Sequence, residues 1–388
     1  MGINDQKKIL IVDDSALMRR IAGDIIDGDS RYHVEDKAHD GLEALELLQK
    51  KRYDAVVLDV NMPRMSGLEL LRELQKQRIS ARVLMFSSTT GEGTKETIEA
   101  LELGAVDFIQ KPAGLAALKD GEFKGHFLEL LAVVAKASLV SGVGTVSAPA
   151  RPAAQRTQTT QTPAAPAAAA DPGRFTRVNL SNLKNIRVRG PVAAVSGEKC
   201  IAIACSTGGP KALQSVIPYI PAGIDAPILL VQHMPAGFTK SLAERLDTLS
   251  KVRVREAQDG DLLEKGTVYL AAGGKHMKVG KSGNRMRIFY TDEPAREGVK
   301  PSANYMYESL MDSPYAEICC AVLTGMGADG TAGIENLEKH KKIYVVAQDE
   351  ATSAVYGMPR AIALTGLVNE IVPLQKVAET IAKRVGVR

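Results

Sequence analysis

Short apolar runs that alternate with amphipathic segments constrain the fold of this chain more than any other feature of its sequence. Five candidate strands, the second weaker than the others, lie at residues 9–12, 33–36, 55–58, 83–86 and 106–109. Most of these runs are unbroken and rich in β-branched residues, as is typical of strands buried on both faces of a sheet. The intervening segments, such as residues 41–48, carry apolar side chains at helical spacing. This alternation predicts a five-stranded, doubly wound parallel sheet.

A second group of apolar runs begins at about residue 198 and predicts a second α/β domain. Its main candidate strands lie at residues 200–204, 228–231, 319–323 and 343–346. Two further runs, 267–271 and 285–290, lie on either side of a glycine-containing turn at residues 280–284. Such a turn favours an antiparallel hairpin. We therefore expect a mostly parallel, doubly wound sheet with an antiparallel hairpin added to it.

Residues 138–197 differ in composition from the rest of the chain: alanine, proline, threonine and glutamine are frequent, and Phe175 is the only aromatic residue. Such a segment buries too little apolar surface to offset its ordering entropy. We therefore expect a flexible linker between one domain at residues 1–137 and another at residues 198–388. Its later part, residues 174–189, has spaced apolar residues and either docks onto a domain or remains a solvated tether.

Composition narrows the class of protein. The net charge of +4 is too small to indicate nucleic-acid binding by itself. The four cysteines show no CxxC spacing, so we expect inert core thiols. We find no run of about 18 apolar residues and no apolar stretch typical of a signal peptide. We therefore expect a cytoplasmic protein.

Polar side chains follow the predicted strands of the first domain. Asp13 and Asp14 follow the first strand, and Asp59 follows the third. With strand order 2-1-3-4-5 these ends meet where the order reverses, so the three carboxylates should converge. Their mutual repulsion indicates a hard cation such as Mg²⁺. Ser87 and Lys111 follow the fourth and fifth strands and should face the same crevice, where Lys111 can pair with an anionic oxygen.

Residues 7–137 resemble the flavodoxin-like receiver domain of response regulators. The resemblance rests on these polar residues, on Lys111-Pro112 and above all on the run DVNMPRMSG at residues 59–67. It implies that Asp59 accepts a phosphoryl group from a histidine kinase and that the bond before Pro112 is cis. The implied Mg²⁺ ligands are Asp13, Asp14, Asp59 and the carbonyl of Asn61. The residues implied in phosphoryl recognition and switching are Ser87, Phe108 and Lys111.

Three polar residues that can form a catalytic triad follow predicted strands of the second domain. Ser206 lies in a small-residue turn between a strand and a helix, His233 follows the next strand, and Asp329 follows the strand at 319–323. A serine nucleophile needs a histidine base, and that histidine needs an acceptor on its other nitrogen. Free N–H groups at a helix start can bind developing negative charge. His276 is a rival base, although its place before the hairpin favours a structural or site-lining role.

Residues 199–388 resemble the catalytic domain of the CheB methylesterase family. The segments that carry the resemblance are residues 206–209, 232–235, 294–295, 323–330 and 356–359. The resemblance implies that Ser206 is the nucleophile, His233 the general base and acid, and Asp329 the orienting carboxylate. Backbone N–H groups near Thr207 and Met326 are the implied oxyanion donors, and no cofactor is expected in this domain. The family's common Asn before the Asp is replaced by Ala328.

By this resemblance, the expected reaction is phosphorylation-activated hydrolysis of glutamyl methyl esters, with glutamine deamidation as a second activity. The expected partners are methyl-accepting chemotaxis receptors and a chemotaxis histidine kinase, with membrane contact only through the receptors. Without phosphorylation, the receiver should shield the Ser206 edge. A DNA-binding regulator would need a helix-turn-helix pattern, which we do not find after residue 199. A non-catalytic receptor adaptor is the other alternative, and the intact triad speaks against it.

Overall fold

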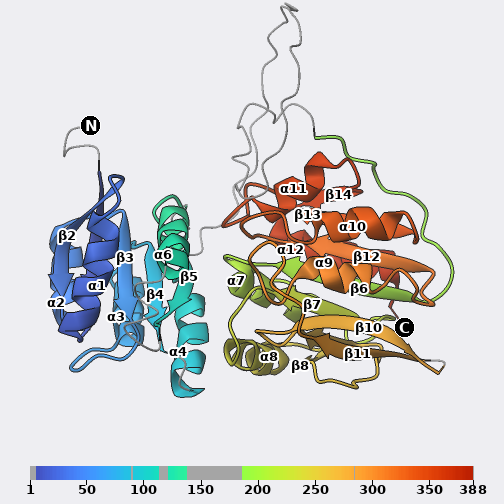
Figure 1. The fold of residues 1–388 in the computed structure, drawn as a ribbon, viewed down its shortest axis with the longest axis horizontal. Helices are drawn as coiled ribbons and strands as arrows, with labels where there is room; N and C mark the ends of the chain where they lie inside the picture. Colours follow the sequence, from blue (N-terminus) through green and yellow to red (C-terminus); the bar gives the residue numbers. More distant parts are fainter. Residues whose placement is uncertain (1–5, 89–90, 113–120, 138–185, 284, 388) are drawn as a thin grey trace, which may run out of the picture. The chain divides into compact units, whose positions relative to one another are not determined.

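The computed structural model describes residues 6–88, 91–112, 121–137, 186–283 and 285–387 (Figure 1). The described residues before 138 and after 185 cluster into one compact unit. Residues 138–185 of the predicted linker lie outside the described residues. The predicted domain boundaries stay a prediction. No described helix is both long enough and apolar enough to cross a bilayer.

The first sheet contains five strands in the order β2-β1-β3-β4-β5. The strands are β1 (Lys7–Val12), β2 (Tyr32–Ala38), β3 (Ala55–Asp59), β4 (Val83–Ser87) and β5 (Asp107–Gln110). All neighbouring pairs are parallel. This confirms the predicted strand order, and it brings the carboxyl ends of β1 and β3 side by side at the edge where the acidic residues follow them.

Helices cover both faces of this sheet because each buries an apolar stripe against it. On one face lie α1 (Ala16–Asp27) and α6 (Gly121–Val134), and on the other lie α2 (Gly41–Lys50), α3 (Gly67–Lys76) and α4 (Gly91–Glu102). Local signals set the helix starts. At α3, the Ser66 hydroxyl accepts the Glu69 N–H at 3.2 Å, and the Glu69 carboxylate accepts the Ser66 N–H at 2.8 Å. This reciprocal capping satisfies two backbone donors.

The second sheet has seven strands in the order β14-β13-β12-β6-β7-β9-β8, all paired in parallel. Its strands are β6 (Lys199–Cys205), β7 (Ile228–Gln232), β8 (Arg253–Glu256), β9 (Thr267–Leu270), β12 (Glu317–Val322), β13 (Ile343–Gln348) and β14 (Glu370–Val372). Strand β6 lies between β7 and β12, so the chain order reverses beside β6. In open α/β sheets, ligands bind at the carboxyl ends of strands beside such a point.

The antiparallel addition is present, but its first strand differs from the prediction. It pairs β10 (His276–Ser282) with β11 (Arg285–Thr291). The run at 267–271, which we expected on one side of the turn, instead contributes β9 to the parallel sheet. Both runs are apolar, and only the neighbours available in the tertiary structure decide which of them pairs with β11.

Helices also cover both faces of the second sheet. On one face lie α7 (Gly209–Gln214), the short 3₁₀ helix η3 (Ile217–Tyr219), α8 (Phe238–Leu249) and α12 (Leu374–Val385). On the other lie the hairpin, α9 (Ala303–Glu308), α10 (Thr331–Glu338) and α11 (Met358–Leu364). All four cysteines are buried here, and burial raises the pKa of each thiol, as expected for inert core residues.

The last part of the predicted linker docks onto the second sheet's helices and loops. The Arg189 N–H donates to the Val368 carbonyl at 2.8 Å, and the Arg384 guanidinium donates to the Val192 carbonyl at 2.5 Å. The sequence left open whether residues 174–189 dock onto a domain or form a solvated tether. For the described part of this segment, which begins at residue 186, the structure shows docking.

Candidate active site and receiver site

The turn that carries Ser206 is held by backbone contacts from two neighbouring strand ends. The Ser206 N–H donates to the Thr324 carbonyl at 3.0 Å, and the Gln232 side-chain amide donates to the Ser206 carbonyl at 3.0 Å. The same amide also donates to the His233 carbonyl at 3.0 Å. Gln232 therefore ties the backbone of Ser206 to the backbone of His233, a role that its place at a strand end did not reveal.

Close backbone approach explains the glycines of this site. A Cβ at Gly325 would lie 2.8 Å from the Ser206 Cβ and 2.4 Å from the Met358 sulfur. A Cβ at Gly209 would lie 1.9 Å from a Gln232 side-chain oxygen. At Gly208 the chain also turns with φ of 73°, in the left-handed region that favours glycine. The loop after β12 thus packs directly against the Ser206 turn.

His233 and Asp329, which are distant in the chain, meet at the carboxyl edge of the second sheet. The His233 Nε2 lies 2.8 Å from an Asp329 carboxylate oxygen, and both side chains are buried. Because Nε2 faces the carboxylate, Nδ1 is the ring nitrogen left for a proton transfer. Ser206, His233 and Asp329 follow the three adjacent strands β6, β7 and β12, as the sequence predicted.

Asp329 is held by donors that sequence reasoning missed. The Ser302 hydroxyl donates to it at 2.6 Å, and the N–H groups of Ala303 and Asn304 donate at 2.6 and 3.1 Å. Burial acts to raise the pKa of Asp329, but the hydrogen bonds from His233, Ser302 and Ala303 outweigh burial and lower it. The carboxylate therefore caps the start of α9 and stays ionised. The only sequence signal was a serine just before a short helical segment.

His276, the rival base, has a structural role. Its Nδ1 accepts the Ser302 N–H at 3.2 Å, so its Nε2 carries the proton that is donated to the Pro294 carbonyl at 3.1 Å. Burial lowers the pKa of His276, which favours this neutral form. The ring packs edge-on against Tyr305. His276 thus supports Ser302, which in turn holds Asp329.

The two expected oxyanion donors lie in the loops that flank Ser206. Thr207 follows Ser206 directly, and Met326 follows Gly325, which packs against the Ser206 backbone. Within the described part of the chain, neither backbone N–H donates to a protein acceptor. Both are therefore available to a substrate oxygen, and their assignment as oxyanion donors stays a prediction.

The acidic residues of the first domain converge as predicted. Ligand oxygens of Asp13, Asp14 and Asp59 all lie within 4.8 Å of one another. The Lys111 ammonium lies 2.8 Å from both Asp13 and Asp59 and offsets part of their repulsion. Burial raises the pKa of Asp59 to about 6, and Lys111 opposes this rise. Three close carboxylates fit Mg²⁺, with the carbonyl of the exposed Asn61 as the further predicted ligand.

Of the predicted switch residues, Lys111 pairs with Asp59, whereas Ser87 and Phe108 contact other partners. The Ser87 hydroxyl is buried and lies 2.5 Å from the Thr97 hydroxyl of α4. The Phe108 ring is also buried and stacks on Phe238 of α8, with 4.6 Å between ring centroids. The peptide bond before Pro112 is not cis, contrary to the implied geometry; among the described residues, only the Lys300–Pro301 bond is cis.

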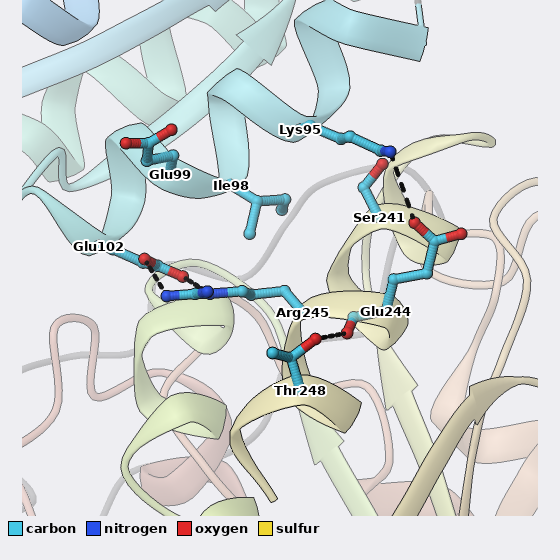
Figure 2. Close-up of a pocket in the computed structure, with 8 residues that line it drawn as sticks. All are labelled: Lys95, Ile98, Glu99, Glu102, Ser241, Glu244, Arg245 and Thr248. Carbon is cyan, nitrogen blue, oxygen red and sulfur yellow. Dashed lines mark hydrogen bonds and ion pairs between the residues drawn. The ribbon is translucent and has the colours of Figure 1, made fainter.

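Side chains of α4 and β5 pack against the second domain around α7 and α8. In Figure 2, α4 and α8 face each other across a pocket, with Glu102 paired to Arg245 through two hydrogen bonds of 2.5 and 2.9 Å. The buried Thr94 and Ser241 hydroxyls lie 2.8 Å apart.

Asp107, the first residue of β5, lies beside the Ser206 turn. Burial raises the pKa of its carboxyl to about 7, while hydrogen bonding with the Thr207 side chain and the Gly208 N–H opposes the rise. A receiver side chain therefore lies against the residues that directly follow Ser206.

Comparisons with known proteins identify the families of both domains. A family model described as CheB methylesterase matches residues 201–381, and one described as response regulator receiver domain matches residues 9–121. A Pyrococcus abyssi protein named protein-glutamate methylesterase/protein-glutamine glutaminase is 39% identical over 97% of this chain and 93% of its own length. A Geobacillus kaustophilus protein of the same name is 38% identical over 98% and 99%. The crystal structure of the Thermotoga maritima CheB methylesterase catalytic domain is 34% identical, covers 48% of this chain and 99% of that one, and gives a TM-score of 0.47.

Proposed function

Because this chain belongs to the CheB methylesterase family and also carries a receiver domain, we propose that it hydrolyses glutamyl γ-methyl esters on the cytoplasmic part of chemoreceptors. The observation that carries the proposal is the buried His233–Asp329 pair at the sheet edge where Ser206 lies. A triad of this kind serves acyl transfer on several unrelated folds.

In the proposed reaction, the Ser206 hydroxyl attacks the ester carbonyl while His233 takes its proton. Asp329 orients the ring and stabilises the imidazolium, and its lowered pKa keeps it ionised for this role. The backbone N–H groups of Thr207 and Met326 receive the charge that develops on the carbonyl oxygen. His233 then returns the proton to the leaving methoxide, so methanol departs. Water, deprotonated by His233, attacks the acyl-enzyme; the bond to Ser206 breaks, His233 returns the proton to the Ser206 oxygen, and the glutamate is released.

The same steps apply to a glutamine side chain, with ammonia as the leaving group. The carbonyl is the same, and His233 can protonate the leaving nitrogen as it protonates the methoxide. The relatives' shared name includes protein-glutamine glutaminase activity, which supports receptor deamidation as a second activity of this chain.

The receiver controls this reaction in our proposal. A chemotaxis histidine kinase supplies the phosphoryl group to Asp59, and Asp13, Asp14, Asp59 and Asn61 would hold a Mg²⁺ ion that offsets negative charge there. The phosphoryl group gives Ser87 and Lys111 a new partner, so Ser87 leaves Thr97 and Phe108 can move. The contacts of Phe108 and Asp107 with the second domain support shielding of Ser206 in the unphosphorylated protein.

Methanol release from a methylated receptor fragment tests the catalytic proposal. In Ser206→Ala the activity should fall to the background rate, because the variant lacks the hydroxyl that is proposed to attack the ester. Ser250→Ala, in the loop after α8, is a matched control and should keep the wild-type rate. Undiminished activity of Ser206→Ala would exclude Ser206 as nucleophile, and an inactive wild-type protein that still binds the receptor would favour the adaptor alternative.

Rates with and without a small-molecule phosphoryl donor and Mg²⁺ test the regulatory proposal. The donor should raise the wild-type rate and leave Asp59→Asn at its basal rate, because the asparagine cannot form the acyl phosphate. Equal stimulation of both proteins would contradict control through Asp59.

A further inference from the structure

Glu297 lies in a strained turn beside the proposed catalytic residues. Arg296 and Val299 bond to each other through both backbone groups, at 3.2 and 3.1 Å, and Glu297 lies between them with φ of 54°. This left-handed conformation is uncommon for residues other than glycine, and it is maintained only where the surroundings determine it. The turn therefore holds a side chain in place at this position at some cost in backbone strain.

The Glu297 side chain is tied into the hydrogen-bond network of Asp329. The Asn304 amide donates to the Glu297 carboxylate at 2.8 Å, and the Asn304 N–H donates to Asp329 at 3.1 Å. The Asn304 side-chain oxygen Oδ1 accepts the N–H groups of Gly330 and Gly333, which fixes the orientation of the Asn304 amide. Glu297 is thus two hydrogen bonds from the carboxylate that binds His233.

The negative charge of Glu297 is not paired. Among the described residues, no Lys or Arg side chain lies within ion-pair distance of it. The adjacent Arg296 points elsewhere, because it forms two hydrogen bonds to Glu308, at 2.7 and 3.0 Å. Partial burial, followed by the charge of Asp329, raises the pKa of Glu297, and Asn304, Arg296 and His233 oppose only part of this rise. The residue as a whole is exposed and so is accessible to a bound substrate.

We propose that Glu297 selects substrates by charge: it admits neutral glutamyl esters and primary amides to the site and repels the carboxylate that hydrolysis creates. The inference rests on the proposed function, which it deepens by naming the accepted class of side chain. A methyl ester and an amide carry no charge, whereas the product is an anion near Glu297 and Asp329. Like charges at close range in a partly desolvated site disfavour binding. Glu297 thereby favours product release.

Two synthetic helical peptides test this role, one with a single glutamate γ-methyl ester and one with the corresponding glutamate. The full-length protein is used with phosphoryl donor and Mg²⁺. In Glu297→Gln, which keeps an oxygen for Asn304, inhibition by the glutamate peptide should strengthen by about five-fold at low salt and less at high salt. The KM for the ester peptide should change by less than about two-fold, since that ligand is neutral. Asp292→Asn, on the same segment and highly exposed, should leave both constants unchanged.

Two further comparisons distinguish a structural role of Glu297 from charge selection. If Glu297→Ala strengthens product inhibition but Glu297→Gln does not, the role is anchoring of Asn304 and the proposal is wrong. Equal inhibition constants in wild type, Glu297→Gln and Asp292→Asn would also overturn it. Anisotropy of the labelled glutamate peptide in the Ser206→Ala background, with and without Glu297→Gln, repeats the comparison without turnover. Because this binding measurement needs no turnover, it tests charge selection by Glu297 separately from the proposed esterase activity.

Discussion

At the scale of single residues, the site depends on one buried carboxylate. Asp329 accepts hydrogen bonds from His233, from the Ser302 hydroxyl and from two N–H groups at the start of α9. A buried anion with this many donors orients His233, and it also fastens α9 to the loop after β12. In the proposed mechanism, catalysis and stability therefore depend on the same carboxylate.

This double role predicts an acid-sensitive stability difference. Because hydrogen bonds lower the pKa of Asp329 in the folded protein, its stabilisation is complete above the usual aspartate pKa of about 4 and is lost as pH falls through the lowered value. Asp329→Asn should cost about 1–3 kcal/mol in the free energy of unfolding at pH 7. The difference between the calorimetric midpoints of wild type and variant should begin to shrink as pH falls below about 4.

The exposed Asp312 gives the control for this measurement. Asp312→Asn should follow the wild-type midpoint at every pH. A deficit of Asp329→Asn that stays constant down to pH 3 would show that its charge does not contribute.

At the scale of secondary-structure elements, the site is built where three parallel strands end. Strand β6 supplies the Ser206 turn, β7 supplies His233, and the loop after β12 supplies Asp329. These loops are in contact because Gly325 packs on the Ser206 backbone and Gly357 packs on the Gly325 carbonyl. The close approach sets the position of the proposed nucleophile relative to its base.

Gly325→Ala should therefore slow catalysis. The new Cβ would meet both Ser206 and the Met358 sulfur, so the turn must shift. Displacing the proposed nucleophile by about 1 Å should lower turnover by about 10- to 100-fold. The rate of ester hydrolysis measures this loss. Gly125→Ala, in α6 with open space around it, is the matched control and should keep full activity. Full activity of Gly325→Ala would mean that the loop can adjust without moving Ser206.

At the scale of the whole molecule, polar and aromatic contacts join the receiver to the second domain. The Glu102–Arg245 pair, the Thr94–Ser241 pair and the Phe108–Phe238 stack all involve α4 or β5 on one side and α8 on the other. Elements α4 and β5 also contain or contact the residues that should respond to phosphorylation. The same contacts can therefore hold the unphosphorylated receiver in place and break on activation.

Arg245→Glu should raise the basal esterase rate. Charge reversal replaces a two-bond ion pair with repulsion, so docking weakens and the rate without phosphoryl donor should increase by about 3- to 10-fold. The double variant Glu102→Arg with Arg245→Glu restores opposite charges and should return towards the wild-type basal rate. An unchanged rate in the single variant would mean that this contact does not limit access to Ser206.

The sequence predicted most of the architecture, and the strand ends at which the proposed site residues lie, because these signals are local. Apolar runs mark the strands, and a polar residue directly after a parallel strand must lie at the carboxyl edge of the sheet. The failures involve contacts between distant segments. The sequence pattern predicts residues 267–271 beside the hairpin turn, whereas they pair in the parallel sheet. Gln232, Ser302 and Asn304 support the site, and in sequence they resemble an ordinary strand end and an ordinary helix start.

The sequence by itself determined the family, the parallel sheets and the order of Ser206, His233 and Asp329 along the chain, because each follows from residues that are adjacent in sequence. Only the tertiary structure decided which donors bind Asp329 and which partners Ser87 and Phe108 contact. It also decided that Glu297, which has no Lys or Arg partner among the described residues, lies beside the proposed site. The physical reason is that these arrangements depend on hydrogen bonds and packing between segments far apart in the chain, and no local pattern specifies which distant partner fills a given position.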